Sequence, residues 1–159
     1  MDDILTMLEK DGRLTAKQIA AALGREEGEV QAAISGYESD GTILKYSALV
    51  NHENLDEASV TALIEIKIAP QLGEGYDRIA QRIYQYDEVD SLYLMTGAYD
   101  LLVTMTAKTM KEAAQFVYSH LAAIKGVTST ATHFIMKKYK EQNCVFVKEP
   151  EQEERLFFI

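Results

Sequence analysis

The sequence has little cysteine, no tryptophan and no long apolar run. Cys144 is the single cysteine, so the chain cannot form an internal disulfide, and a reducing cytoplasm is the expected setting. The N-terminal stretch MDDILTMLEKDG is acidic and lacks the apolar core of a secretory signal. No stretch approaches the ~18 consecutive apolar residues that a membrane-spanning helix needs. We therefore expect a cytoplasmic protein with no membrane partner.

Basic residues are also scarce. The 159 residues include 16 Lys and Arg against 25 Asp and Glu, which gives a formal net charge of -9. Domains that bind polyanions by bulk charge are usually basic, so this balance argues against that mode of binding. The hydrophobic content of 47% is ordinary for a globular protein, and the length allows one medium domain or two small ones.

Catalytic and metal-binding motifs are missing as well. The histidines, His52, His120 and His133, are scattered without metal-ligand spacing. We interpret His120 as a core residue of a helix and His133 as a structural residue of a strand. Cys144 has no neighbouring His or cluster of cations to activate its thiol, and no Gly-rich phosphate loop occurs. The sequence therefore predicts no enzyme activity, no metal and no cofactor.

Two short helices are expected before residue 25. The apolar residues of the first share one face and are Ile4, Leu5 and Leu8, with Gly12 as its stop. Thr15 is expected to cap the second helix and to form a capping box with Gln18. Ile19 and Leu23 are its inward residues, and Gly24 ends it.

A third helix is expected within REEGEVQAAISGYESDG, residues 25–41. Val30, Ile34 and Tyr37 recur as one apolar stripe, and Gly41 supplies the stop. Three short helices with a tight turn between the second and third predict a helix-turn-helix unit. TILKYSALV, residues 42–50, is expected to be extended and to form the strand of a winged unit. A general three-helix packing unit is the alternative interpretation.

The rest of the chain alternates between strand and helix patterns. Strands are expected in VTALIEIKI (60–68), VDSLYLMTG (89–97), DLLVTMTA (100–107) and VTSTATHFIMKKYK (127–140). Helices are expected in GYDRIAQRIYQY (75–86) and in TMKEAAQFVYSHLAAIKG (109–126), the latter capped by Thr109 and stopped by Gly126. The order β-α-β-β-α-β predicts a ferredoxin-like fold with two helices on one sheet face. The other face and the edge strands then favour a homodimer.

Several strings resemble the Lrp/AsnC, or feast/famine, family of transcriptional regulators over roughly residues 1–140. They are ILTMLEKDGRLTAKQIAAALG, YESDGTILKYSALVN, LMTGAYDLLVTM and LAAIKGVTSTATHFIMKKYK. The resemblance implies an α+β protein with a winged helix-turn-helix domain and a βαββαβ ligand-binding domain, the dimeric α-β barrel or RAM fold. It also implies an amino acid as the effector and a homodimer that can close into a tetramer or octamer.

This family resemblance gives expected domain boundaries. The DNA-binding domain is expected at residues 1–50, a linker at 51–59 and the effector-binding and oligomerisation domain at 60–140. Residues 141–159 form a C-terminal tail, in which an acidic stretch precedes the apolar LFFI that we expect to dock on its own or a neighbouring subunit.

Double-stranded DNA is the partner that the resemblance implies, although residues 1–50 are acidic. They hold five Lys and Arg against nine Asp and Glu, a formal charge of -4. Gln31 and Ser35 are expected at base edges, with Glu27 and Ala32 beside them, because Gln pairs with adenine and Glu accepts from cytosine N4. Lys17, Arg25 and Lys45 are expected at phosphates. The alternative is a sensing oligomer whose helix-turn-helix is vestigial.

TGAYD, residues 96–100, is the candidate effector site. Gly97 permits a positive φ, Ala98 and Tyr99 offer a wall, and Asp100 can hold an ammonium group. We expect three hydroxyl groups to line the same site, those of Thr128, Ser129 and Thr130. The competing interpretation is an ordinary hairpin turn in which the aspartate bonds its own backbone.

Sirohaem decarboxylases share this two-part architecture and give an enzyme alternative. Their pockets need basic residues and histidines to hold a polycarboxylate macrocycle. The candidates in this chain are few and form no motif: Arg78, Arg82 and His133.

Overall fold

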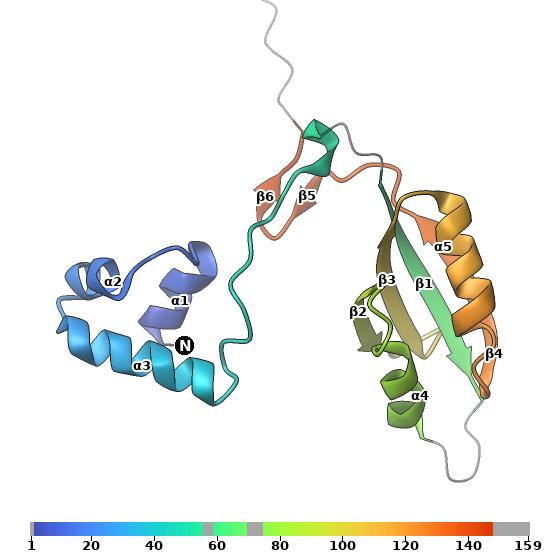
Figure 1. The fold of residues 1–159 in the computed structure, drawn as a ribbon, viewed down its shortest axis with the longest axis horizontal. Helices are drawn as coiled ribbons and strands as arrows, with labels where there is room; N and C mark the ends of the chain where they lie inside the picture. Colours follow the sequence, from blue (N-terminus) through green and yellow to red (C-terminus); the bar gives the residue numbers. More distant parts are fainter. Residues whose placement is uncertain (1, 56–58, 70–74, 148–159) are drawn as a thin grey trace, which may run out of the picture. The chain divides into compact units, whose positions relative to one another are not determined.

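The computed structural model describes residues 2–55, 59–69 and 75–147. The expected docking of the tail, from the acidic stretch to LFFI, lies outside the described residues. The chain divides into two compact units, residues 1–50 and 51–159 (Figure 1). Each unit has its own hydrophobic core, so each is described by itself.

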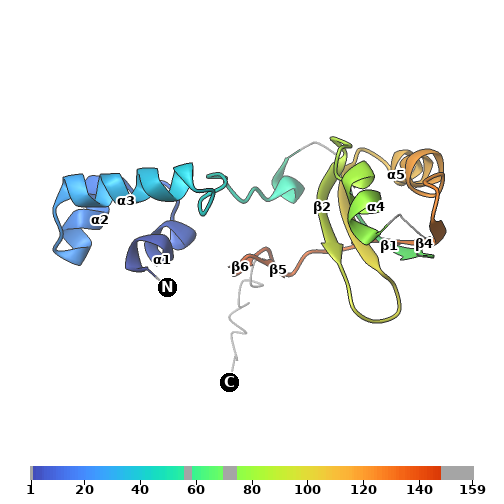
Figure 2. The same cartoon turned by 90° about the horizontal axis from the view of Figure 1, so that it is seen from below.

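The N-terminal unit consists of three helices, α1 (Asp3–Lys10), α2 (Ala16–Leu23) and α3 (Glu27–Ser39) (Figure 2). They bury one apolar cluster, made of Ile4, Leu8, Ala16, Ile19, Ala20, Val30 and Ile34. Leu23 and Tyr37 pack against this cluster from partly buried positions. The predicted stripes of α2 and α3 are therefore confirmed. That of α1 is confirmed at Ile4 and Leu8 but not at Leu5, which is half-buried and does not belong to the cluster.

Local hydrogen bonds define where these helices begin and end. The Thr15 side chain accepts from the Gln18 N–H, and the Gln18 side chain accepts from the Thr15 N–H, so the predicted capping box is confirmed. Gly24 ends α2 with a φ of 65°, a left-handed conformation that favours glycine. Glu26 then precedes α3 without a side-chain cap, and α3 follows α2 after only residues 24–26.

The expected wing strand in residues 42–50 does not form, and this prediction was wrong. The segment contains no strand, although Ile43 packs on the core and its N–H bonds the Tyr37 carbonyl at 2.8 Å. Leu44 is 87% exposed, and Val50 is exposed as well. A strand needs a neighbouring strand for its backbone hydrogen bonds, and within the described residues nothing pairs with this segment.

The C-terminal unit has the predicted order β-α-β-β-α-β. After a short 3₁₀ turn, η1 (His52–Asn54), the strands are β1 (Val60–Ile68), β2 (Val89–Leu94), β3 (Leu101–Ala107) and β4 (Val127–Phe134). The helices are α4 (Tyr76–Ile83) and α5 (Met110–Phe116), and α5 continues into the π-helical turn η2 (Val117–Leu121). The sheet is antiparallel in the order β2-β3-β1-β4, which leaves β2 and β4 at its edges.

Strand alternation separates the two faces of this sheet. Every second residue of β1 and β3 is buried, as Ile64 and Val103 illustrate. The helices α4 and α5 cover this face of the sheet (Figure 1). The opposite face carries both apolar and polar side chains, which are half-buried or exposed among the described residues. On it the His133 Nε2 lies 3.4 Å from a Glu65 carboxylate oxygen, and Tyr93 is exposed.

Two details of the last third of the chain differ from the prediction. The fourth strand ends at Phe134, and a separate hairpin follows, formed by β5 (Lys140–Glu141) and β6 (Cys144–Val145). Gln142 and Asn143 make its turn with φ values of 46° and 64°. This two-residue turn supplies the left-handed conformations that tight hairpins need.

His120 is exposed, so its interpretation as a core residue was wrong. The helix after Phe116 widens into the π-helical turn η2, which buries Val117 and Leu121 and turns His120 outward. The imidazole instead stacks at 5.0 Å from the ring of Tyr86 and 5.1 Å from that of Phe116. The helix also ends at Leu121, before Gly126.

Candidate functional site

The outer side of α3 is the first candidate surface. Val30 and Ile34 face the core, and this turns Glu27, Gln31, Ala32 and Ser35 to solvent. The Gln31 amide nitrogen donates to the Ser35 hydroxyl over 3.5 Å, one helical turn away. All four side chains predicted to contact DNA on this helix are therefore accessible on one rigid element.

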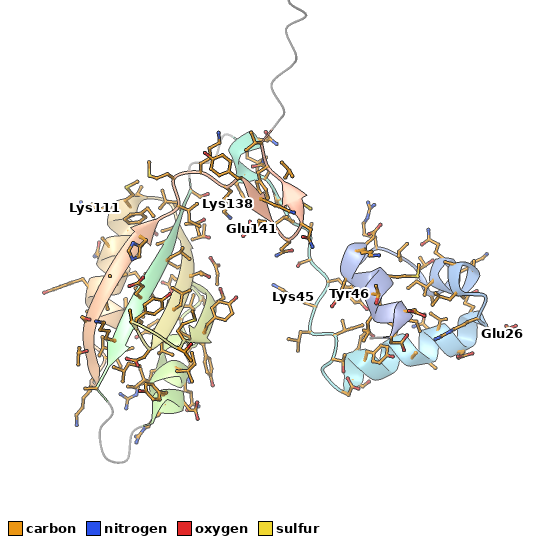
Figure 3. The ribbon with its side chains drawn as sticks, turned by 180° about the vertical axis from the view of Figure 1, so that it is seen from behind. Glu26, Lys45, Tyr46, Lys111, Lys138 and Glu141 are labelled. Carbon is orange, nitrogen blue, oxygen red and sulfur yellow. The ribbon has the colours of Figure 1, made fainter. Side chains whose placement is uncertain are left out.

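The three predicted phosphate-contacting cations are also exposed: Lys17 on α2, Arg25 in the turn before α3 and Lys45 after α3. Figure 3 shows Glu26 at the start of α3 and Lys45 on the segment that follows it. The helix α3 itself contains Glu27, Glu29 and Glu38 and no Lys or Arg. Positive charge in this unit thus lies beside α3 and not on it.

Tyr46 anchors the segment that carries Lys45. Its hydroxyl donates to a Glu38 carboxylate oxygen at 3.0 Å, and its ring lies against Gly12, where an added Cβ would be 3.3 Å from the ring. Burial and the Glu38 carboxylate raise the pKa of the Tyr46 hydroxyl. This contact holds the start of the segment near the helices, so it limits where Lys45 can reach.

The second candidate site lies at the end of the sheet where β1 finishes. The β2–β3 hairpin, residues 95–100, and the start of β4 meet there, because Ile66 pairs with both Leu101 and Thr130. Gly97 has a φ of 125°, so the predicted positive φ is confirmed. Ala98 is exposed and Tyr99 half-buried, which leaves the tip of the hairpin open to solvent.

Asp100 is hydrogen-bonded to other residues of its own chain. One carboxylate oxygen accepts from the Ile68 N–H at 2.7 Å, and the other lies 3.5 Å from the Tyr76 hydroxyl. Its backbone N–H donates to the Ile66 carbonyl at 2.9 Å. The competing interpretation held that the aspartate bonds the backbone of its own hairpin turn. It was wrong, because the Asp100 carboxylate accepts from the end of the neighbouring strand β1.

The predicted hydroxyl groups do not all converge. The Thr128 hydroxyl donates to the Lys67 carbonyl at 3.1 Å, across the β1–β4 pair. Ser129 pairs with Lys67 and Thr130 with the buried Ile66, so strand alternation sends these two side chains to opposite faces of the sheet. The structure thus brings Thr130, but not Ser129, to the helix-covered face.

Sequence reasoning missed Tyr76. This residue opens α4 and reaches Asp100, which lies 24 residues further along the chain, so no local spacing could have revealed the contact. The aromatic residue at the start of a predicted helix was the only available signal. Tyr76 links α4 to the β2–β3 hairpin.

The residues considered for a tetrapyrrole pocket do not form one. Arg78 and Arg82 lie on α4, which covers one face of the sheet, whereas His133 pairs with Leu63 on the other face. No group of three or more His, Cys, Asp or Glu side chains able to hold a metal ion occurs in the part of the chain that is described. Nor does any helix in that part combine the length and hydrophobicity that crossing a membrane requires.

Comparisons with known proteins identify the class to which this fold belongs. The sequence pattern of the Lrp/AsnC ligand binding domain matches residues 61–145. The HTH-type transcriptional regulator YugG of Bacillus subtilis is 40% identical over 145 residues, which cover 91% of this chain and 87% of YugG. The leucine-responsive regulatory protein of Salmonella typhimurium is 27% identical over 149 residues, 92% of this chain and 88% of that protein.

A solved structure supports the fold. The transcriptional regulator NMB0573 of Neisseria meningitidis, in complex with L-Met, superposes with a TM-score of 0.72 at 23% identity, over 89% of this chain and 93% of that one. The present chain belongs to the Lrp/AsnC family of transcriptional regulators. The resemblance seen in the sequence is thereby confirmed.

Proposed function

We propose that this protein is an amino-acid-responsive regulator that binds double-stranded DNA through α3 and acts as a homodimer or larger homo-oligomer. The observation that carries the proposal is the exposure of Glu27, Gln31, Ala32 and Ser35 on α3, outside its buried stripe. A helix of 13 residues held on one side by a core is a form suited to the major groove. In this assignment α2 and α3 are the helix-turn-helix, and the chain carries out no catalysis.

DNA recognition in this proposal depends on base edges more than on phosphates. The Gln31 amide can pair with adenine in a bidentate way, and Glu27 can accept from cytosine N4. In this proposal the DNA phosphates are contacted by three exposed cations, Lys17, Arg25 and Lys45. Since few phosphates are neutralised by each unit, affinity for one half-site is low, and several copies in one oligomer raise it.

The proposed effector is a free amino acid bound at the sheet end formed by residues 97–100 with Thr128 and Thr130, whereas Ser129 lies on the other face of the sheet. The L-Met complex of the Neisseria protein and the name of the Salmonella protein support an amino acid as the ligand class. Gly97 and Ala98 leave backbone groups accessible for the carboxylate of the ligand. Because Asp100 already bonds Ile68 and Tyr76, its oxygens can receive the ammonium group only by sharing these contacts.

A second copy of the chain is the proposed partner for the open sheet face. This face carries Leu63 and Leu102 among polar residues, and the edge strands β2 and β4 flank it. Burying such a face between two subunits removes apolar area and unpaired edges from water. In the proposed assembly, an effector that prefers one arrangement of subunits changes the spacing of the DNA-binding units.

Fluorescence anisotropy with labelled DNA from the region upstream of the protein's own gene tests DNA binding. We expect affinity that depends on candidate amino acids, with a shallow slope of log affinity against log salt that reflects about 2–4 phosphates per unit. The absence of binding at low salt, with and without each of the amino acids, would defeat the proposal. A scrambled DNA fragment of equal length controls for non-specific association.

The acidic N-terminal unit favours a second candidate, a sensing oligomer that does not bind DNA. Its formal charge of -4 over residues 1–50 deprives it of the counterion release that drives most non-specific binding. Calorimetry distinguishes the two candidates, because the second predicts amino-acid binding by a protein that shows no anisotropy change with any DNA.

A further inference from the structure

Lysines gather in one short stretch of this acidic chain. Lys137, Lys138 and Lys140 lie within four residues, and no other stretch of five residues holds more than two Lys or Arg. Residues 134–147 contain these three lysines and a single acidic residue, Glu141, so their formal charge is +2 in a chain whose net charge is -9. A local concentration of one sign of charge favours a partner of the opposite sign.

The lysines lie on and just before a built hairpin. The strands β5 and β6 pair in antiparallel fashion, and the Phe146 N–H donates to the Tyr139 carbonyl at 3.0 Å (Figure 1). The Lys138 ammonium group donates to a Glu141 carboxylate oxygen at 3.0 Å, which fixes this side chain against the hairpin (Figure 3). A surface that is ordered before binding loses less conformational entropy when a partner arrives.

The exposed side chains of this hairpin are mainly hydrogen-bond donors. Lys137 and Lys140 are exposed, and the Lys137 ammonium lies 5.2 Å from the centre of the exposed Tyr139 ring. Gln142 and Asn143, at the turn, are exposed as well. Ammonium groups, side-chain amides and phenolic hydroxyls can all donate to phosphate oxygens. The one carboxylate of the hairpin already pairs with a lysine.

From this arrangement we infer that the β5–β6 hairpin, with the lysines before it, binds the phosphate backbone of double-stranded DNA as a second contact surface besides α3. The inference rests on the proposed function and adds cations that the acidic N-terminal unit lacks. Lys137 and Lys140 neutralise phosphates, and the amides of the turn donate to phosphate oxygens. These contacts read no bases, so they raise the affinity for every sequence alike and leave base discrimination to α3.

Fluorescence anisotropy on the full chain tests the inference with one variant that carries Lys137→Gln, Lys138→Gln and Lys140→Gln. The probes are the duplex from upstream of the protein's own gene and a scrambled duplex of equal length. We expect both duplexes to bind about tenfold more weakly at ~0.1 M salt, with the ratio of their affinities unchanged. The slope of log affinity against log salt should become shallower by about one or two.

A matched control removes the same charge from another part of the same unit. It carries Lys108→Gln, Lys111→Gln and Lys125→Gln, three exposed lysines at and around α5, where Figure 3 shows Lys111. Attraction at a distance is screened within about 10 Å at 0.1 M salt, so this control should lose no more than about twofold in affinity. The comparison separates a contact with DNA from a change in net charge.

A substitution in the opposite direction sharpens the test. Glu141→Gln removes the carboxylate that holds Lys138, so the hairpin gains charge and the salt slope should steepen by up to about one. The affinity for both duplexes should rise with it. Glu88→Gln, at an exposed position on another part of the unit, is the control and should change the affinity less.

The possible failures are distinguishable. If the unaltered chain binds neither duplex at low salt, the proposed function and the inference both fail. If the unaltered chain binds while the hairpin variant keeps its affinity and salt slope, or loses no more than the α5 control, only the inference is overturned. Circular dichroism confirms that each variant is folded, and Lys140→Gln alone keeps the test valid if the triple variant does not fold. A changed oligomeric state of the hairpin variant in light scattering assigns these lysines to contacts between subunits and also overturns the inference.

Discussion

The outer side of α3 and the sheet end around Asp100 use their polar side chains in opposite ways. On α3, Gln31 and Ser35 share one long hydrogen bond of 3.5 Å, and Glu27 is exposed. At the sheet end, Asp100 bonds Ile68 and Tyr76, and Thr128 bonds Lys67. One surface keeps its polar groups available for a partner, and the other uses several of them to hold its own chain together.

This difference separates two kinds of functional residue. A side chain that makes no structural contact can be exchanged with little effect on folding stability. Its loss therefore changes only the affinity for the ligand. A side chain that bonds neighbouring elements affects stability first, and its loss changes ligand binding through the shape of the site. Stability measurements on single variants should therefore distinguish the two surfaces, with larger costs at the sheet end.

The largest cost is expected for Gly126→Ala. Gly126 has a φ of 99°, and an added Cβ would lie 2.9 Å from the Cδ1 of the buried Ile79. Backbone strain and overpacking together are expected to lower the free energy of unfolding of the C-terminal unit by roughly 2–5 kcal/mol. Chemical denaturation followed by circular dichroism measures the change.

Gly97→Ala is the matched control for that substitution. Gly97 also has a positive φ, 125°, but no atom lies within 4 Å of its added Cβ. Its cost should be limited to backbone strain, about 1–3 kcal/mol. Equal costs for the two variants would show that the contact with Ile79 relaxes and that the sheet end is less tightly packed than the distances indicate.

Asp100→Ala is expected to have the next largest effect. The substitution leaves the Ile68 N–H without its carboxylate acceptor, which should destabilise the C-terminal unit by about 1–3 kcal/mol. Asp100→Asn keeps an oxygen for that N–H and removes the charge, so it should retain more of the stability. If Asp100→Ala unfolds at the same denaturant concentration as the unaltered chain, the structural role assigned to this carboxylate is wrong.

The same pair of variants separates structure from ligand binding. Should Asp100→Asn keep its stability and lose amino-acid affinity, the carboxylate also contacts the ammonium group of the effector. Should it keep both, Asp100 acts only by positioning the hairpin and Tyr76.

Local signals in the sequence predicted most helices and strands, whereas they could not predict contacts between residues far apart in the chain. The capping box of Thr15 and Gln18 and the bounds of β1 follow from spacings of a few residues, and the structure confirms them. The prediction of a wing strand was wrong because residues that favour an extended backbone do not by themselves supply a second strand to pair with. The prediction that His120 is a core residue was wrong because a π-helical turn changes the helical spacing after Phe116. The contact of Tyr76 with Asp100 depends on topology, which no local pattern contains.

A smaller effect, dependent on pH, is expected on the inner side of α3. The Tyr37 hydroxyl donates to the Asp2 carboxylate, which also accepts from the Ile4 N–H at the start of α1. The hydrogen bond from Tyr37 is the main cause that lowers the pKa of Asp2, and the bond from Ile4 and the charge of Arg25 act in the same direction. Folding thus depresses this pKa, so the stabilisation is present above the ordinary aspartate value of about 3.9 and is lost as pH falls through the lowered value.

Hydrogen exchange of the α1 and α3 amides between about pH 2 and pH 6 tests this linkage. The unaltered N-terminal unit should lose protection as the pH falls through this range, beyond the intrinsic change in exchange rate. Tyr37→Phe removes the hydroxyl, keeps the ring and should flatten this dependence. Identical pH profiles for the two proteins would refute the contribution of the Tyr37–Asp2 bond.

The smallest change in stability is expected for Gln31→Ala, on the surface whose side chains are not used by the fold. Gln31 is exposed, and alanine is a good helix former, so the free energy of unfolding should change by no more than about 0.5 kcal/mol. If Gln31 reads adenine, the same variant should lose ~1–3 kcal/mol of discrimination between the preferred base and its substitutes. Lys17→Ala is the contrasting variant, because loss of a phosphate contact weakens binding to all sequences and reduces the salt slope. Gln31→Ala with unchanged base preference would remove Gln31 from the recognition surface, and a large loss of stability would show that the outer side of α3 contributes to folding after all.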